Sequence, residues 1–405
     1  MKISSITLFD HLSPAPDQDL ARLGTVIAAA RAAYEAAGYE VQTTRLATCD
    51  FETLTAQAAS PVDWAMRLEA AAQAHGFEYV SLGLVPRAAL ASLPEIFAAT
   101  EAVFASADLI ASSKGVRAID GATVHEAAQV IYRAADIEAG FGNLRFTASA
   151  NVPPGTPFFP AAYHDGGPTT FTLAMESADL AVTACQEADT AADARNRLRA
   201  AIEQEAAGLV AVAGRLADQH DLRFGGLDFS LAPFPTAACS IGAALERIAG
   251  GPLGCPGTLA AAALLTDAID QAKFPHAGFC GLMLPVLEDL VLGQRSAEGR
   301  LDLASLLQWS AVCGTGLDTV PLPGDLAPAT LAHILWDVAA LALRLDKPLT
   351  ARLMPLPGKR AGDPVHFDFA YFADGGVLEI APPATTGHLT CETSLPLTAR
   401  AHRSV

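Results

Sequence analysis

Short apolar runs alternate with helix-like patterns along most of the chain. The run ISSITLF (3–9) is typical of a strand. Apolar residues then recur at helical spacing from Leu20 to Tyr34, and Gly38 suits the end of that helix. Continued in the same way, the pattern predicts strands at 3–9, 41–46, 79–85, 109–113, 146–150, 169–175, 224–229, 319–322, 350–355 and 377–380.

Helical patterns fill the intervals between these strands. Ser60 suits the N-cap of one helix, and Gly76 suits its end. The remaining helices are predicted near 94–105 and at 190–220, 237–249, 257–272 and 302–312. Alternating strands and helices indicate a mostly parallel sheet covered by helices. Because there is no clear linker, we expect a single α/β domain that spans residues 1–380 and a tail that spans residues 381–405. Periodicity alone does not separate a closed barrel from an open sheet.

Composition and charge narrow the class of protein. With 51% hydrophobic and 17% charged residues, the chain has ample material for a large core. Its 44 acidic and 26 basic residues give a net charge of -18, which disfavours binding to nucleic acid or to an anionic membrane. The N-terminal apolar run meets Asp10 early, so we expect a strand there rather than a signal peptide, and no run reaches the length of a membrane span. We therefore expect a soluble, cytoplasmic protein.

The cysteines indicate neither a disulfide framework nor a cysteine-rich metal site. There are seven of them, widely scattered and without a CxxC pair. This excludes a zinc ribbon or a thioredoxin motif, and free thiols fit a reducing cytoplasm. The sequence also contains no dinucleotide or Walker glycine motif, no HExxH, and no haem or iron–sulfur motif. The cofactor stays unknown, although carboxylates could bind a divalent cation.

Polar residues near strand ends are the candidates for site chemistry, because ligands meet parallel α/β folds at the carboxyl ends of the strands. The candidates from this rule are Asp10, Lys114, His164, Asp165, Glu176, Asp228 and Ser230. His164 is the best of them, since imidazole titrates near neutrality and the loop 151–168 around it is rich in proline and glycine. It could instead be a histidine whose ring is bonded to backbone.

The other candidates have less specific signals. Lys114 could clamp a carboxylate, act as an electrophile or form a Schiff base, or it could be a solvated lysine. Asp10 and Glu176 could be paired carboxylates for proton transfer or for an ion, or simply caps. Ser230 lacks the GxSxG elbow of hydrolases, which favours a turn role. Asp228 lies in an apolar strand and should have a partner, because burying a lone carboxylate is costly.

The stretch SAVCGTGLD (310–318) adds two more candidates. Cys313 follows the helix at 302–312, and we expect Gly314 to form a left-handed cap. The negative end of the helix dipole disfavours a thiolate there, so Cys313 fits a packed helix end better than an ionic nucleophile, with a pocket-lining thiol as the alternative. Asp318 is similarly a turn acceptor or a site carboxylate.

Four segments together resemble the DUF711 family, also called UPF0210. They are ASSKG (111–115), AAYHDGG (161–167), GLDFSLAPFPTA (226–237) and CGTGLDTVPLPGD (313–325). The resemblance runs from Asp10 to about residue 380. It implies the fold of pyruvate formate-lyase, which is a ten-stranded α/β barrel of two antiparallel halves, each with five parallel strands, and helices outside. It also implies a homodimer and a possible ACT-domain partner, but no established reaction.

The resemblance does not extend to radical chemistry. The tail lacks the Arg-Val-x-Gly-aromatic motif of glycyl-radical enzymes. We therefore expect a non-radical enzyme that acts on a polar metabolite by acid–base or lyase-type chemistry. Its expected catalytic residues are His164, Lys114, Glu176, Asp10 and Cys313, and its expected substrate contacts are Ser230, Asp228, Asp318 and Asp165. The alternative is a metabolite- or ion-binding regulatory protein that works with an ACT-domain partner.

Overall fold

The computed structural model describes residues 1–405 except 14–15, 50, 57, 382–386 and 401–405. Its main sheet has nine strands in the order β10-β11-β7-β4-β3-β2-β1-β8-β9. These strands are β1 (Lys2–Phe9), β2 (Val41–Ala47), β3 (Tyr79–Leu84), β4 (Val103–Asp108), β7 (Phe146–Ala150), β8 (Thr170–Glu176), β9 (Arg223–Ala232), β10 (Gly316–Pro323) and β11 (Leu349–Leu356).

The sheet is mostly parallel. The strands β1, β2, β3, β4 and β7 form one parallel group. The pairs β8–β9 and β10–β11 are each parallel and run opposite to that group, because β8 is antiparallel to β1 and β11 is antiparallel to β7. The expected mixed α/β fold with a large, mostly parallel sheet is confirmed. The expected ten-stranded barrel is not confirmed, since the largest sheet among the described residues has nine strands.

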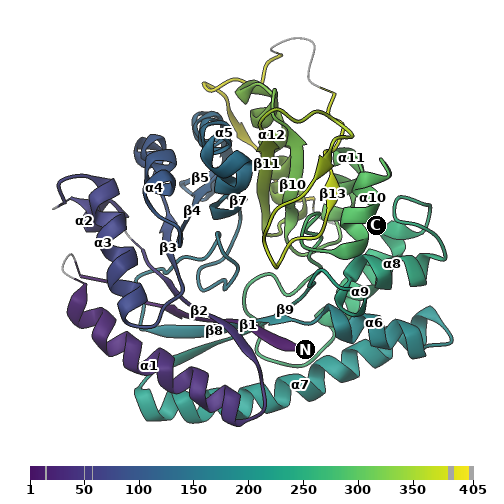
Figure 1. Ribbon diagram of the computed structural model, residues 1–405, viewed down its shortest axis with the longest axis horizontal. Coiled ribbons are helices and arrows are strands. Elements are labelled where there is room, and N and C mark those ends of the chain that lie inside the picture. Colours follow the sequence, from purple (N-terminus) through teal and green to yellow (C-terminus); the bar gives the residue numbers. More distant parts are fainter. Residues whose placement is uncertain (14–15, 50, 57, 382–386, 401–405) are drawn as a thin grey trace.

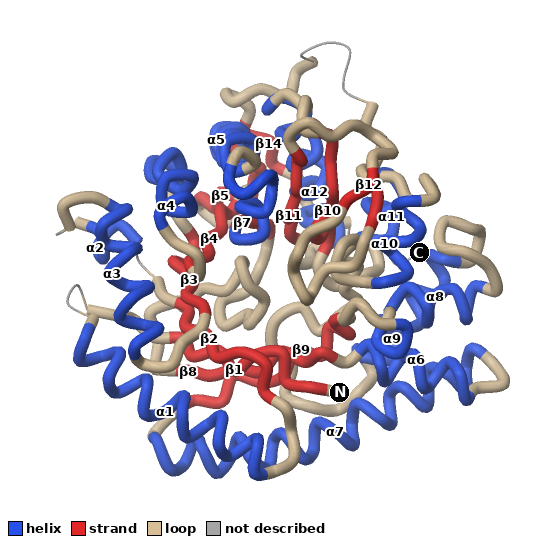
Figure 2. Tube along the Cα trace, viewed as in Figure 1, coloured by secondary structure: helices blue, strands red, loops and turns tan. Residues whose placement is uncertain are grey.

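Helices cover the outer, convex side of the curved sheet (Figures 1 and 2). They are α1 (Asp17–Ala36), α2 (Phe51–Thr55), α3 (Pro61–Ala74), α4 (Leu93–Ala99), α5 (Gly121–Ala134), α6 (Ala178–Glu187), α7 (Ala191–His220), α8 (Ile241–Ala249), α9 (Thr258–Asp270), α10 (Leu290–Ala297), α11 (Leu303–Ser310) and α12 (Pro328–Leu345). By length and composition alone α12 is apolar enough to cross a membrane, but 56% of it is buried inside the fold. Its apolar residues therefore form part of the core.

The loop 151–168 lies against the inner side of the strands. Residues 156–162 are buried throughout. Phe159 packs with Phe9, Ala47 and Phe104, and the hydroxyl of Ser81 donates to the carbonyl of Ala162 at 2.7 Å. The loop thus fills part of the concave side with two neighbouring aromatic rings, Phe158 and Phe159.

An irregular segment, 275–287, lies between the two edge strands of the sheet. On one side the N–H of Met283 donates to the Ser230 carbonyl of β9 at 3.0 Å. On the other side the N–H of Val286 donates to the Asp318 carbonyl of β10 at 3.1 Å. The segment therefore bonds to both β9 and β10.

Three predicted elements differ from the structure. The strand expected at 109–113 is β5 (Ile110–Ser113), which forms a hairpin with β6 (Val116–Asp120) outside the main sheet. The strand that lies in the main sheet at this point of the chain is β4. The helix expected near 94–105 ends at Ala99 because the next apolar residues belong to β4. No strand of the described chain covers 377–380, although Leu378 donates to the Pro321 carbonyl at 3.0 Å.

The C-terminal segment also pairs with the domain. β14 (Ser394–Pro396) is antiparallel to β6. The short strands β12 (Pro364–Val365) and β13 (Gly375–Gly376) form a separate pair that packs on α10.

Two glycines allow the segment 275–287 to approach the loop before β10. A Cβ atom on Gly281 would lie 2.3 Å from the Cα atom of Gly314, and one on Gly314 would lie 2.6 Å from the Cα atom of Gly281. Gly314 does not adopt the left-handed cap that we expected from the sequence, since its φ is not positive. Its lack of a side chain serves this backbone contact instead.

We expect Gly281→Ala to lower the free energy of unfolding by about 3 kcal/mol, because both clashing partners are backbone atoms that cannot rotate away. Gly214→Ala is the matched control, since Gly214 lies in α7 with open space around it. It should raise stability by about 0.5–1 kcal/mol. Urea unfolding of both variants measures the difference, and equal effects would contradict the close contact.

Candidate functional site

The expected pair of carboxylates is not brought together. Phe9 pairs with Thr170 and Lys2 pairs with Glu176, so Asp10 and Glu176 lie at opposite ends of β1 and β8. At about 3.3 Å per residue they are roughly 25 Å apart. Asp10 accepts hydrogen bonds from Arg22 (2.9 Å) and from Thr169, which gives its carboxylate local partners. The two acids therefore do not form one proton-transfer or ion site.

His164 and Asp165 line a pocket at the Asp10 end of the sheet, which we call the His164 pocket. Its cavity volume is about 310 Å³, and Arg223, His276 and Thr172 also line it. Nε2 of His164 lies 3.0 Å from the Gly167 carbonyl, and Nδ1 lies 3.8 Å from Oδ1 of Asp165. The ring is thus bonded to backbone, as the alternative reading of the sequence proposed.

Lys114 lies away from both ends of the main sheet. It occupies the exposed turn between β5 and β6, with a φ of 51°, and Gly115 follows with a φ of 78°. The structure does not bring Lys114 into a pocket with the other predicted residues, because the strand before it is not part of the main sheet.

Asp228 and Ser230 hold the segment 275–287 in place. Oδ2 of Asp228 accepts the N–H of Phe279, and Oδ1 accepts the N–H of Cys280, both at 3.0 Å. The hydroxyl of Ser230 also donates to Asp228. The partner that a buried carboxylate requires is therefore this turn, and Gly278 leaves room for it.

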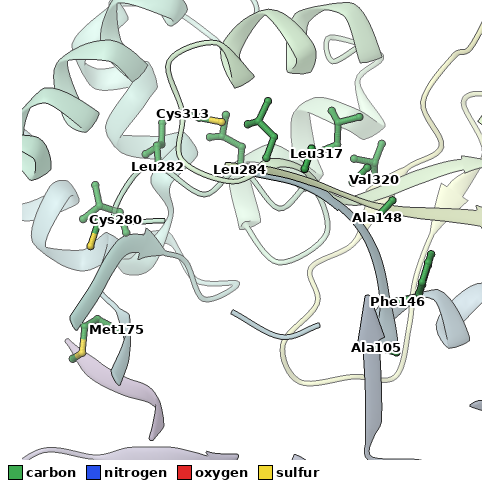
Figure 3. Close-up of a cluster of buried hydrophobic side chains, with 14 of the residues drawn as sticks. Ala105, Phe146, Ala148, Met175, Cys280, Leu282, Leu284, Cys313, Leu317 and Val320 are labelled. Carbon is green, nitrogen blue, oxygen red and sulfur yellow. The ribbon is translucent and has the colours of Figure 1, made fainter. Parts of the chain in front are cut away.

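Cys313 is 1% exposed and lies beyond the last turn of α11. Figure 3 shows its side chain in a buried apolar cluster with Leu282, Leu284 and Leu317. Its N–H donates to the Trp309 carbonyl at 2.8 Å, and its own carbonyl accepts from Lys347. The thiol fits the packed position better than a nucleophile.

The strongest concentration of buried charge surrounds a different space, which we call the interior cavity. It has a volume of about 120 Å³. The residues that line it are Ser4, Gln42, Thr43, Arg45, Tyr79, Phe104, Leu144, Phe159, Glu176, Ala232, Pro233, Glu288, Arg352, Phe369 and Tyr371. Most come from β1, β2, β3, β4, β8, β9 and β11, and the rest from the loop 151–168, the segment that precedes α10, the residues just before β7 and just after β9, and the segment 369–371.

Arg352 joins two carboxylates beside this cavity. Its Nε donates to Oδ1 of Asp318 and its Nη2 donates to Oε1 of Glu288, both at 2.6 Å. Asp318 is fully buried, and its Oδ2 has no hydrogen-bond partner among the described residues. Asp318 is therefore part of a buried ion network, behind Arg352 rather than on the cavity wall.

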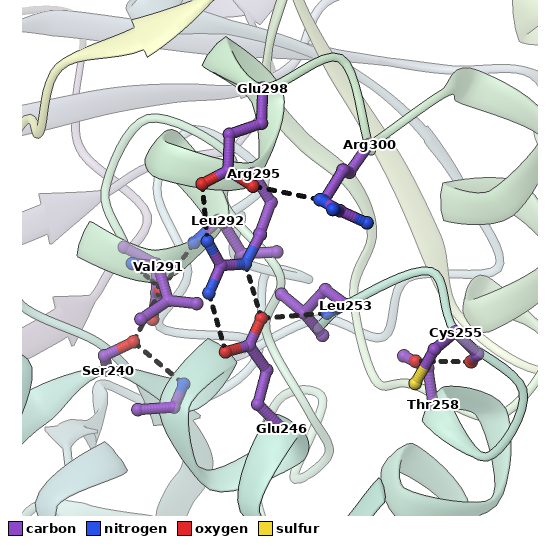
Figure 4. A network of polar contacts seen from close by, with 12 residues as sticks. Ser240, Glu246, Leu253, Cys255, Thr258, Val291, Leu292, Arg295, Glu298 and Arg300 are labelled. Atoms are coloured by element: carbon purple, nitrogen blue, oxygen red, sulfur yellow. Dashed lines mark hydrogen bonds and ion pairs between the residues drawn. The ribbon is translucent and has the colours of Figure 1, made fainter. Parts of the chain in front are cut away.

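Glu288 is held at the cavity by the start of α10. The next residue, Asp289, caps this helix by accepting the N–H groups of Val291 and Leu292 at 2.9 Å each. Arg295 then ties α10 to α8 through a two-pronged pair with Glu246, at 2.6 and 2.9 Å (Figure 4). Both ends of the short helix are fixed, so Glu288 has a defined position.

The interior changes the protonation of Glu288. Burial raises the pKa of Glu288 to about 7, against the opposing effect of Arg352 and with a further increase from Asp318. A carboxyl group with a pKa near neutrality can both accept and donate a proton under physiological conditions. Strong perturbation by burial in a cavity is typical of a functional residue.

Arg45 has no carboxylate in contact. Its Nε donates to Thr43 at 2.9 Å, and its guanidinium lies 5.6 Å from the ring centre of Tyr79 and 5.2 Å from that of Phe159. Burial lowers the pKa of Arg45 to about 10. The group is a cation beside two aromatic rings at the cavity wall.

Aromatic side chains form one part of the cavity wall. Phe369 and Tyr371 line it, and the ring of Phe369 packs 5.1 Å from that of Phe141. At the other side Glu176 accepts a hydrogen bond from Gln42, and burial raises the pKa of Glu176. Aromatic and acidic side chains therefore form part of the cavity wall.

No group of three or more metal-ligating side chains is arranged for an ion within the described part of the chain. The residues that could hold a ligand in the cavity are instead Arg45, Arg352 and Glu288, with the hydroxyls of Tyr79 and Tyr371 near them. This set suits an organic anion with a polar second group.

Sequence reasoning missed Arg45, Glu288 and Arg352. The rule on carboxyl ends of strands failed for them because Arg45 and Arg352 lie within β2 and β11 and Glu288 lies outside the strands. It did find Glu176, which ends β8 and lines the cavity. A signal did exist. Arg352 interrupts the apolar strand LTARLMPL and Glu288 interrupts LPVLEDLVL, as Asp228 interrupts its own strand. A charge inside an apolar strand requires a partner.

Comparison with known proteins identifies the family. The model of the family described as Uncharacterised ACR (DUF711) matches residues 4–370. The chain belongs to the DUF711 family. A UPF0210 protein of Pyrobaculum arsenaticum is 35% identical over 347 residues, which cover 80% of this chain and 76% of that protein. A UPF0210 protein of Desulforudis audaxviator is 33% identical over 315 residues, or 75% and 67% of the two chains. The resemblance seen in the sequence is confirmed, and these names carry no activity.

Proposed function

We propose that this DUF711 protein is an enzyme that transfers protons on a small polar metabolite, without radical chemistry, in the interior cavity. The observation that carries the proposal is Glu288, a carboxyl group with a pKa of about 7 on the wall of the cavity, where its side chain is 25% exposed. Arg352 fixes its position through the contact at 2.6 Å. Glu288 takes a proton from the metabolite and returns it, or protonates a leaving group in a lyase-type step.

The fold supports a confined site for this chemistry. The segment 275–287 bonds to β9 and to β10, which supports the proposal that it completes a ten-membered ring with the nine strands. Such a ring would enclose the cavity between its two halves, with the loop 151–168 as an inner wall. Water exclusion strengthens the electrostatic contacts on which proton transfer depends.

Deuterium exchange tests the proposal without knowledge of the substrate. The protein is incubated in D₂O with a panel of hydroxy, keto and amino acids and polyols, and ¹H NMR follows the loss of C–H signals. We expect catalysed exchange in at least one compound. The absence of exchange across the panel would overturn the proposal. Loss of exchange in His164→Ala would move the site to the His164 pocket and overturn the assignment to the cavity.

A metabolite-binding regulatory protein is the second candidate. It is favoured by the His164 pocket, where a ring bonded to the Gly167 carbonyl is suited to holding a ligand rather than to proton transfer. Such a protein would act through a partner such as a small ACT-domain protein. It would bind a metabolite in calorimetry and catalyse no deuterium exchange.

A further inference from the structure

The interior cavity contains two guanidinium groups with different surroundings. Arg352 contacts two carboxylates, Asp318 and Glu288. Arg45 contacts none among the described residues, and its terminal nitrogens donate no hydrogen bond there. The nearest groups to its faces are the aromatic rings of Tyr79 and Phe159. The interior therefore leaves one cation without a counter-ion in contact.

Glu288 acts on Arg45 only from a distance, and a cation that is shielded from water without a carboxylate in contact is costly, so its retention requires a reason. Cation–π contacts offset part of this cost, but they leave the planar N–H edge of the guanidinium unused. That edge matches the two oxygens of a carboxylate, with two parallel hydrogen bonds. The cavity volume of about 120 Å³ suits a small ligand.

We infer that the ligand of the interior cavity is a small carboxylic acid, held through its carboxylate by Arg45 with its other end toward Glu288. The inference rests on the proposed function for the role of Glu288, and it adds the chemical class of the substrate. A volume of about 120 Å³ is well above the ~10–15 Å³ that one water molecule requires, and it suits an acid of a few carbon atoms.

Electrostatics add a dependence on pH. The charged groups that act on Glu288 are Arg352, Asp318 and Arg45, and the other titratable groups on the cavity wall are Glu176, Tyr79 and Tyr371. Because the pKa of Glu288 is about 7, this residue is mostly neutral below that pH and mostly anionic above it. An anionic ligand is repelled by the anionic form, so binding should weaken as the pH rises through about 7. Glu288→Gln should remove this dependence.

Propionate and propionamide are matched probes, since they share their shape and differ in charge. We expect propionate, but not propionamide, to bind the full-length protein in a ligand-observed NMR titration at about pH 6. Arg45→Met should weaken propionate binding at least tenfold. Arg67→Met is the control, because Arg67 is an exposed arginine of α3, and it should leave binding unchanged. Equal binding of the two probes, unchanged binding by Arg45→Met, or tighter binding of inorganic phosphate would overturn the inference.

Thermal unfolding without ligand provides a second readout. If Arg45 serves a ligand, Arg45→Met should unfold at the same temperature as the wild type or higher, because a buried charge is removed. A marked decrease would assign Arg45 a structural role and overturn the inference.

If propionate binds as expected and no compound exchanges deuterium, the proposed function fails and the carboxylate site stands. If an uncharged metabolite exchanges and propionate does not bind, the carboxylate site fails and the proposed function stands.

Discussion

Arg352→Met is expected to lower the free energy of unfolding by about 3–5 kcal/mol, because it leaves two carboxylates without their shared cation in the interior. Asp318 is fully buried and one of its oxygens already lacks a partner, so it cannot turn to water. Unfolding in guanidinium chloride at neutral pH measures the loss.

Two features separate this effect from a simple loss of packing. The deficit should shrink as the pH falls from neutral, because Glu288 is mostly neutral below about pH 7 and a neutral carboxyl group costs less to bury. The triple variant Arg352→Met, Asp318→Asn, Glu288→Gln should recover most of the lost stability, since it removes all three charges together. Arg197→Met, in an exposed ion pair with Asp193, should cost less than about 1 kcal/mol. A deficit that is independent of pH, or absent recovery in the triple variant, would contradict the ion network.

Glu288→Gln is expected to slow the proposed deuterium exchange by about 10²- to 10⁴-fold, the range over which a general acid or base contributes. Glutamine preserves the shape of the side chain and one oxygen for Arg352, but it cannot carry the proton. Binding of the carboxylate probe should be retained, and above about pH 7 it should be tighter than in the wild type, because the variant carries no negative charge there. This split between turnover and binding distinguishes proton transfer from a structural role.

The same variant makes a prediction for stability. Since the folded protein raises the pKa of Glu288 above its ordinary value, the native state binds more protons than the unfolded state between about pH 4.5 and about pH 7. The free energy of unfolding that this group contributes in the wild type is therefore lost as the pH rises from about 4.5 to about 7. Relative to Glu288→Gln, the wild type should become less stable from about pH 5 to about pH 8. The opposite trend, or a Glu288→Gln variant with full exchange activity, would contradict the assigned role.

The sequence pattern predicts the sheet better than the site. Strands such as β1, β2 and β7 follow from apolar runs flanked by helical patterns, and α7 follows from its length and regular spacing. The helix α12 was missed, because its apolar residues occupy nearly all faces of a buried helix and obscure the amphipathic period. β5 was placed in the wrong sheet, since a short exposed hairpin and a buried strand share the same residue types.

The site depends on information that one sequence does not contain. Of the polar residues predicted near strand ends, His164, Asp165 and Asp10 lie at one end of the sheet, Glu176 lies at the other end, and Lys114 lies in an outer hairpin. The cavity residues Arg45, Glu288 and Arg352 lie far apart in the chain: Arg45 is in β2, Glu288 just precedes α10, and Arg352 is in β11. Their meeting depends on the opposite direction of β8–β11 and on the irregular segment before α10, which periodicity does not predict.

The most direct test of the central claim is a crystal structure of the protein soaked with propionate at about pH 6. The account predicts electron density for the acid in the interior cavity, with both carboxylate oxygens within hydrogen-bond distance of the Arg45 guanidinium. The same soak of Arg45→Met should leave that density absent. An empty cavity in the wild type, with propionate bound instead in the His164 pocket, would contradict the account.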